Sequence, residues 1–217
     1  MLPVATCLLA LFALLIAESS DSRVARAIAK LTASSAFVWA ALEWGAAQTP
    51  FGQLVLVGLL FCWIGDALLL STGQTLWFRL GIGAFMLAHL CYALAYARLP
   101  LEPVPLVACA ALVGLGAWRS YQWLGPHLPS GFRGPVIAYI AIISLMVGLA
   151  GASVIGGAPT LLGIGALGFA LSDLSVARDR FVAAGFLNAA WGLPAYYLSQ
   201  LAIAYAASHV THASSGA

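Results

Sequence analysis

The sequence predicts an all-α membrane protein, a polytopic helix bundle with about eight transmembrane helices. Of its 217 residues, 63% are hydrophobic and 7% are charged, whereas an ordinary soluble domain has roughly 25% charged residues. Nine basic and seven acidic side chains cannot cover the surface of a soluble globule, which excludes a soluble domain. The apolar stretches are long and unbroken, a pattern typical of helices and not of barrel strands.

Each predicted helix follows from one apolar stretch, at about 20 residues per crossing. Prolines lie at or just before several of the starts, where a missing N–H group does no harm. The stretch 134–172 carries no charge and is too long for one pass, so the turn Gly156–Pro159 divides it. The predicted helices are Leu2–Ala17, Ile28–Ala46, Phe51–Ser71, Leu80–Ala97, Val104–Trp123, Pro135–Ile155, Thr160–Ala177 and Ala183–Ala207.

We expect residues 1–217 to form one integral-membrane domain, without a separate soluble part. The first stretch, Leu2–Ala17, could instead be the core of a signal peptide. No basic segment precedes it and no small-x-small cleavage site follows it. We therefore expect it to remain as the first helix.

The basic residues predict the orientation of the bundle. With eight passes, the segments after the odd-numbered helices share one side of the membrane, and the opposite side holds only Arg98 and Glu102. Basic loops stay cytoplasmic, so both termini are expected to face away from the cytoplasm, and the expected location is a bacterial inner membrane. The residues on the basic side are Arg23, Arg26, Lys30, Arg79, Arg119, Arg133, Arg178 and Arg180.

Two carboxyl groups, Asp66 and Asp173, lie inside apolar stretches. A carboxylate in such surroundings costs at least a few kcal/mol, so a partner or a function must retain it. Each lies about five residues before the end of a helix that runs toward the basic side, roughly 8 Å below the interface. At equal depth the two can share one site, either as catalytic groups or in structural ion pairs with arginines such as Arg178. We interpret Glu43, near the other side, as structural.

Further polar side chains lie within predicted spans and are candidates for the same pocket. We interpret Trp191 and Tyr196 as packing or interfacial aromatic residues. His89 is isolated from the other histidines, and a zinc hydrolase needs two or three histidines with a carboxylate, so no catalytic metal is expected. The pocket candidates are His89, Tyr92, Tyr139, Asn188, Tyr197 and Gln200.

Three sequence blocks occur in order between Gly65 and Gln200. The blocks are Gly65-Asp66-Ala67-Leu68-Leu69 with Phe85, His89 and Tyr92; Gly165-Ala166 with Phe169 and Ser172-Asp173; and Tyr196-Tyr197-Leu198-Ser199-Gln200. They resemble the GD-x-x-L, F-x-x-x-H-x-x-Y, GA-x-x-F-x-x-SD and YY-x-x-Q motifs of the YhhN-like membrane proteins, which include the lysoplasmalogenases. The first third of the chain matches less closely, since Leu31 follows Lys30 where the family has proline.

The resemblance implies that the protein hydrolyses the vinyl-ether bond of a lysoplasmalogen, releasing a fatty aldehyde and glycerophosphocholine or glycerophosphoethanolamine. It implies no cofactor, a lysophospholipid and water as partners among membrane lipids, no nucleic acid, and Asp66 and Asp173 as the functional residues. One carboxyl group would protonate the double bond and the other would activate water; the sequence leaves open which is which. Arg79, Arg178 or Arg180 would hold the phosphate.

Three other functions remain compatible with the residues. Four helices followed by four, with an aspartate late in the third and seventh, are compatible with a proton-coupled transporter built from a repeat. A scaffold or lipid-binding protein would use the aspartates in structural pairs. A hydrolase of another lysolipid would share the fold and differ in its substrate.

Overall fold

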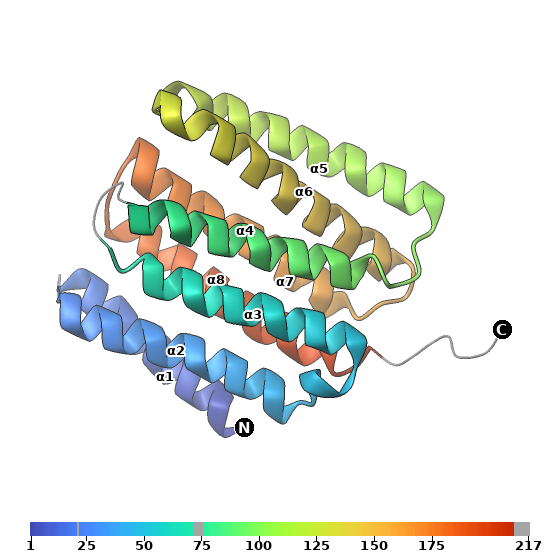
Figure 1. The fold of residues 1–217 in the computed structure, drawn as a ribbon, viewed down its shortest axis with the longest axis horizontal. Helices are drawn as coiled ribbons and strands as arrows, with labels where there is room; N and C mark the ends of the chain where they lie inside the picture. The colour runs from blue at the N-terminus through green and yellow to red at the C-terminus, as the bar shows by residue number, and fades with distance from the viewer. Residues whose placement is uncertain (21, 72–75, 211–217) are drawn as a thin grey trace.

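A computed structural model describes residues 1–20, 22–71 and 76–210 of the protein. Within these ranges the chain forms eight α-helices and no strand, which confirms the predicted helix bundle (Figure 1). The helices are α1 (Leu2–Ser19), α2 (Arg23–Glu43), α3 (Pro50–Leu68), α4 (Leu76–Tyr96), α5 (Pro103–Leu124), α6 (Arg133–Ile155), α7 (Thr160–Ala177) and α8 (Phe186–Ala207).

Six of the described helices, α1 and α3 to α7, are long and apolar enough to cross a membrane. The protein is therefore a multi-pass integral membrane protein. The other two carry more polar residues: α2 begins with Arg23 and Arg26, and α8 contains Asn188 and Gln200. Both Asn188 and Gln200 are buried, so the polar groups of α8 face the interior of the bundle and not the lipid.

The helix ends differ most from the sequence-based expectation where polar residues begin or end a helix. Helix α2 starts at Arg23 and not at Ile28, because the side chain of Ser22 accepts a hydrogen bond from the backbone N–H of Ala25 and caps the helix there. After α7 the chain continues as a π-helical turn, η4 (Arg178–Val182), and α8 begins at Phe186, three residues later than expected.

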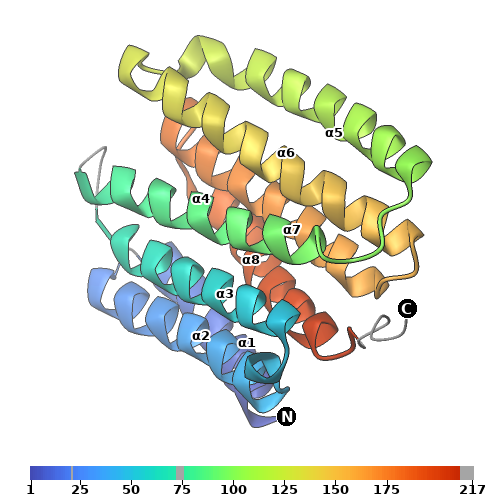
Figure 2. The same cartoon turned by 45° about the vertical axis from the view of Figure 1, so that its right-hand side comes forward.

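Consecutive helices pack as antiparallel neighbours, except α4 and α5, and the molecule is a stack of helix pairs with α5 outermost and α1 and α2 at the opposite side (Figures 1 and 2). The C-terminal ends of α1, α3, α5 and α7 lie at the same end of the bundle as the N-terminal ends of α2, α4, α6 and α8 (Figure 1). We call this the basic end, because Arg26, Arg79, Arg133, Arg178 and Arg180 lie there.

Glycines permit close approach within two of the helix pairs. A side chain at Gly58 of α3 would collide with the ring of Tyr92 on α4, and a Cβ atom at Gly65 would lie 2.6 Å from the Phe85 ring. Between α7 and α8, a Cβ atom at Gly192 would collide with the hydroxyl of Ser175. Small residues at such contacts allow membrane helices to pack backbone to backbone. These glycines allow α3 to pack closely against α4, and α7 against α8.

Candidate active site

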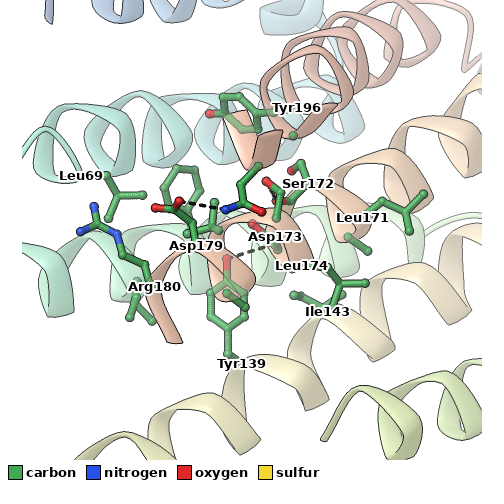
Figure 3. A pocket seen from close by; sticks show the side chains of 18 of the residues that line it. Leu69, Tyr139, Ile143, Leu171, Ser172, Asp173, Leu174, Asp179, Arg180 and Tyr196 are labelled. Carbon is green, nitrogen blue, oxygen red and sulfur yellow. Dashed lines mark hydrogen bonds between the residues drawn. The ribbon is translucent and has the colours of Figure 1, made fainter. Parts of the chain in front are cut away.

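A cavity of about 720 Å³ opens from the basic end into the bundle. Asp66 at the end of α3 and Asp173 near the end of α7 both line it, together with Tyr139 of α6 and Tyr196 of α8. Figure 3 shows Asp173, Tyr139 and Tyr196 around the central part of this cavity. The helix packing thus brings the two intramembrane carboxyl groups to one site.

Asp66 is surrounded by hydrogen-bond donors and a cation. Its side chain is 2% exposed, and Lys30 Nζ lies 3.1 Å from Oδ1. The hydroxyl groups of Ser34, at 2.6 Å, and Tyr196, at 2.8 Å, both bond to Oδ2. An ionised carboxylate can only accept hydrogen bonds, whereas ammonium and phenol groups donate them. The surroundings of Asp66 therefore suit the charged form.

Helix α2 supplies two of these three groups because Lys30 and Ser34 are one turn apart on the same face. The backbone carbonyl of Lys30, at 3.0 Å, shares the single hydroxyl proton of Ser34 with Asp66. Tyr197 of α8 lies 3.3 Å from the Ser34 hydroxyl and donates to the Lys30 carbonyl, also at 3.3 Å. Helices α2, α3 and α8 are thereby tied together around one carboxylate.

Asp173 has different partners and a more open position. Its side chain is 14% exposed, Tyr139 donates a hydrogen bond to Oδ2 at 3.1 Å, and His89 Nε2 lies 3.1 Å from the same oxygen. Among the described residues, its ion-pair partner is this histidine, and no lysine or arginine pairs with it. Water and a ligand in the cavity can reach this carboxyl group.

The orientation of His89 restricts where protons can be. Its Nδ1 lies 2.7 Å from the carbonyl oxygen of Phe85, and a carbonyl can only accept, so Nδ1 carries a hydrogen. The ring stacks on Phe169 with centroids 4.1 Å apart and is fully buried. Nε2 forms no aligned hydrogen bond, and its nearest partner is the Asp173 carboxyl group. The imidazole therefore lies 3.1 Å from the Asp173 carboxyl group, a distance over which a proton can pass between them.

Charged side chains of both signs line the part of the cavity near the basic end. Arg180 lies over the Phe78 ring at 4.8 Å, and Arg26 Nε is 3.1 Å from a carboxylate oxygen of Glu18. Asp179 accepts from the amide of Asn188 at 3.0 Å. All of these residues except Phe78 carry polar groups, and all of them line the cavity. This part of the cavity therefore carries charges of both signs.

The sequence-predicted pocket residues fall into three groups. Tyr139 and Asn188 line the cavity. His89 does not line it, but its Nε2 atom lies 3.1 Å from the Asp173 carboxyl group. Arg178 bonds to Asn188 and Tyr197 lies 3.3 Å from the Ser34 hydroxyl, so both contact residues of the site without lining the cavity. The remaining three residues lie away from the cavity: Tyr92 donates to Gln200 at 2.7 Å in the core, and Arg79 lies over the Phe132 ring at 5.0 Å.

Sequence reasoning missed three residues beside Asp66. The sequence places Lys30 among the basic residues that orient the bundle, and the structure places it two turns inside α2, beside Asp66. Ser34 was not considered, although the spacing of a lysine and a serine four residues apart places both on one helix face. Tyr196 packs against aromatic rings such as Phe85, as the sequence indicates, and its hydroxyl group also bonds to Asp66.

Metal-ligating side chains do not gather elsewhere in the part of the chain that the structure describes. No group of three or more His, Cys, Asp or Glu side chains there is close enough to hold a metal ion. The four cysteines, Cys7, Cys62, Cys91 and Cys109, are free thiols within helices. The polar groups at the cavity include the carboxyl groups of Asp66 and Asp173, the phenols of Tyr139 and Tyr196 and the ammonium group of Lys30.

The YhhN family model matches residues 3–207 of the chain. The chain is 34% identical over 164 residues to the bovine protein named lysoplasmalogenase TMEM86A, and 32% identical over 164 residues to the human protein of that name. Each alignment covers 73% of this chain and 66% of the relative, so the chain spans just under two thirds of their length.

A bacterial relative is similar over a shorter stretch. The Mycobacterium tuberculosis protein named lysoplasmalogenase is 35% identical over 139 residues, which is 55% of this chain and 50% of that protein. No solved structure matches the chain significantly.

Proposed function

The chain belongs to the YhhN family, and from this premise we propose that it is a lysoplasmalogenase. The reaction is hydrolysis of the vinyl-ether bond of a lysoplasmalogen, which yields a fatty aldehyde and glycerophosphocholine or glycerophosphoethanolamine. Relatives with that name, at 32% to 35% identity, support the activity. The two aspartates in one membrane cavity support a mechanism in which the protein's own carboxyl groups act as acid and base.

One observation carries the mechanism: the two carboxyl groups have opposite surroundings within one cavity. Asp66 faces the Lys30 ammonium group and two hydroxyl donors, which favour the carboxylate. Asp173 faces His89 and Tyr139, and among the described residues no lysine or arginine pairs with it. General acid and base need different protonation states at the same moment. We therefore assign Asp173 as the acid and Asp66 as the base.

The first chemical step is proton transfer from Asp173 to the β-carbon of the vinyl ether. The C=C electron pair forms the new C–H bond, and the adjacent carbon becomes an oxocarbenium ion. The Asp66 carboxylate stabilises this positive charge across the cavity, as carboxylates do in glycoside hydrolysis. Asp173 is left ionised, with His89 behind it.

Water then adds to the oxocarbenium carbon while Asp66 removes a proton from it, which gives a hemiacetal. In the collapse of the hemiacetal, the protonated Asp66 returns its proton to the departing glycerol oxygen. The hemiacetal hydroxyl group gives its proton to Asp173 as the aldehyde C=O forms. One water is consumed, and both aspartates regain their starting protonation states.

The polar entrance of the cavity suits the head of a lysophospholipid. A phosphate group at the basic end would lie near Arg180 and Arg26, and the ammonium group of choline or ethanolamine near Asp179 or Glu18. The vinyl ether lies just below the glycerol in such a lipid, at a depth comparable with that of the aspartates. The reaction would take place at the cytoplasmic leaflet of a bacterial inner membrane, where basic ends are retained.

Aldehyde release from a lysoplasmalogen by the detergent-purified protein tests the proposal. The saturated ether analogue serves as the unreactive control substrate. We expect Asp66→Asn and Asp173→Asn each to lower kcat by about 10²- to 10⁴-fold, the usual contribution of a general acid or base. Glu43→Gln is the matched control, because it removes a carboxylate that lies outside the cavity, and it should retain full activity.

The outcomes separate the activity from the mechanism. A folded wild-type protein that releases no aldehyde contradicts the proposed activity. A protein that releases aldehyde at an unchanged rate after Asp66→Asn or Asp173→Asn contradicts the carboxyl pair instead. Hydrolysis of an acyl-ester lysolipid to a fatty acid, without hydrolysis of the vinyl ether, would indicate a different lysolipid hydrolase.

A further inference from the structure

We infer that the cavity opens sideways into the bilayer between α5 and α7, and that the hydrocarbon chain of a lysolipid lies in this opening. The inference rests on the proposed function for the identity of the ligand. The opening itself follows from the side chains that line the cavity. It defines a chain-binding subsite next to the carboxyl groups.

The first observation is that several cavity residues also face the surroundings of the bundle. Leu112 of α5 is 72% exposed, and Leu167 and Leu171 of α7 are 53% and 45% exposed. All three lie in helices that are apolar enough to span a membrane. A cavity wall whose apolar residues are half-exposed in the membrane region is open to lipid.

The second observation is the loose attachment of α5. Leu124 is its only fully buried residue, although the helix is 22 residues long. It packs along α6 and lies at the outer edge of the bundle (Figures 1 and 2). The less exposed residues of α6 from Val136 to Val147 form the floor of the cavity between α5 and α7. The segment from Val136 to Val147 spans roughly 16 Å, enough for a substantial part of a hydrocarbon chain.

The third observation is the order of polarity along the cavity. Figure 3 shows Arg180 and Asp179 on one side of Asp173 and Tyr139, and the apolar side chains of Leu171 and Ile143 on the other. A ligand with charges at one end and hydrocarbon at the other would place the bond between them at Asp173. A lysophospholipid has this arrangement, with charged groups at one end and a single hydrocarbon chain at the other. Its chain can reach the site from the bilayer without leaving the hydrocarbon phase.

Two glycines of α5 allow a matched test. A Cβ atom at Gly116 or at Gly114 would meet no heavy atom within 4 Å, so larger side chains fit the fold at both positions. Gly116 lines the cavity and Gly114 does not. Gly116→Trp should fill the chain subsite, whereas Gly114→Trp makes the same chemical change outside it. Both substitutions lie in the middle of one helix.

The experiment measures binding of saturated alkyl-ether lysolipids with long and short chains to wild type and both variants in detergent. We expect Gly116→Trp to weaken long-chain binding about tenfold, the effect of displacing about two methylene groups. Binding of the short-chain lipid should stay within about twofold, and Gly114→Trp should match wild type for both lipids.

Equal behaviour of the two variants, or unchanged long-chain binding by Gly116→Trp, would overturn the inference. The saturated lipid is not a substrate, so this readout is independent of catalysis. If the Gly116→Trp effect appears but wild type hydrolyses no vinyl ether, the chain subsite stands and the proposed function fails. If the wild type hydrolyses the vinyl ether but the two variants bind the long-chain lipid equally well, the proposed function stands and the chain subsite fails.

Discussion

Asp66 on α3 and Asp173 on α7 are both near the C-terminal ends of their helices and line the same cavity, yet they are neutralised by different means. Asp66 is closed in by a lysine and two hydroxyl groups, and its side chain is almost inaccessible. Asp173 faces a histidine and a tyrosine and is partly open to the cavity. The lysine favours the ionised form of Asp66 before the reaction, as a base requires, whereas the imidazole beside Asp173 can follow the loss and recovery of a proton.

The two sets of partners come from different helices. Asp66 is surrounded by α2 and α8, and Asp173 by α4 and α6. Each set can therefore be altered without touching the other. Substitutions in one set can therefore be compared with substitutions in the other for their effects on stability and on kcat.

Removal of the cation beside Asp66 should have the largest effect on stability. Lys30→Met leaves a buried carboxylate without its partner, and the free energy of unfolding should fall by about 3–5 kcal/mol. The double variant Lys30→Met/Asp66→Asn should recover most of this loss, because no unpaired charge remains. Thermal unfolding in detergent measures both. A double variant no more stable than Lys30→Met would show that the lysine stabilises the fold by packing alone.

Removal of the histidine beside Asp173 should affect catalysis more than stability. His89→Gln keeps a polar side chain but cannot share a mobile proton with Asp173, so kcat should fall about 100-fold, or about 2.7 kcal/mol in activation free energy. The melting temperature should change less than for Lys30→Met. His127→Gln, at an exposed histidine of the turn Gly125–His127, is the control. Equal kcat for the two variants would refute the role given to His89.

The two tyrosines should differ by a smaller amount. Tyr196→Phe removes a hydrogen bond to a buried carboxylate and should lower the free energy of unfolding by about 1.5–3 kcal/mol. Tyr139→Phe removes a bond to a group that water can reach, and the loss should be about 1 kcal/mol or less. Chemical denaturation of both variants gives the comparison. A larger loss for Tyr139→Phe would contradict the view that Asp66 is the more enclosed charge.

The fold was predictable because lipid imposes a strong constraint on sequence. Long apolar stretches and turn residues identify helices without knowledge of their contacts, and the end of α7 at Ala177 was predicted to the residue. The start of α2 was missed because Arg23 and Arg26 lower the local hydropathy, although they lie in the first turn of a capped helix. Hydropathy averages the polarity of all the residues in a segment and does not report the hydrogen bond that caps a helix.

The contacts of the site were harder to predict because they depend on helix rotation and depth. Tyr196 and Tyr197 are neighbours in sequence, but successive helical residues point about 100° apart. One contacts Asp66 and the other Ser34, and the sequence alone favoured Tyr197. Arg79 and Arg180 both occur at the basic end, but the packing of α4 turns Arg79 toward Phe132 and away from the cavity. Asp66 and Asp173 stood out because few charges occur within the spans.

The ion pair between Lys30 and Asp66 also has a consequence for biosynthesis. Each of the two charges is unfavourable by about 3 kcal/mol when its helix enters the bilayer alone. Helix α2 is too polar to qualify as a span by composition, and its counter-charge is on α3, the next helix to be synthesised. The two helices are therefore best inserted together as a hairpin, with the lysine and the aspartate neutralising each other during entry. The same pair that fixes the charge of the site would thus help to integrate α2 into the membrane.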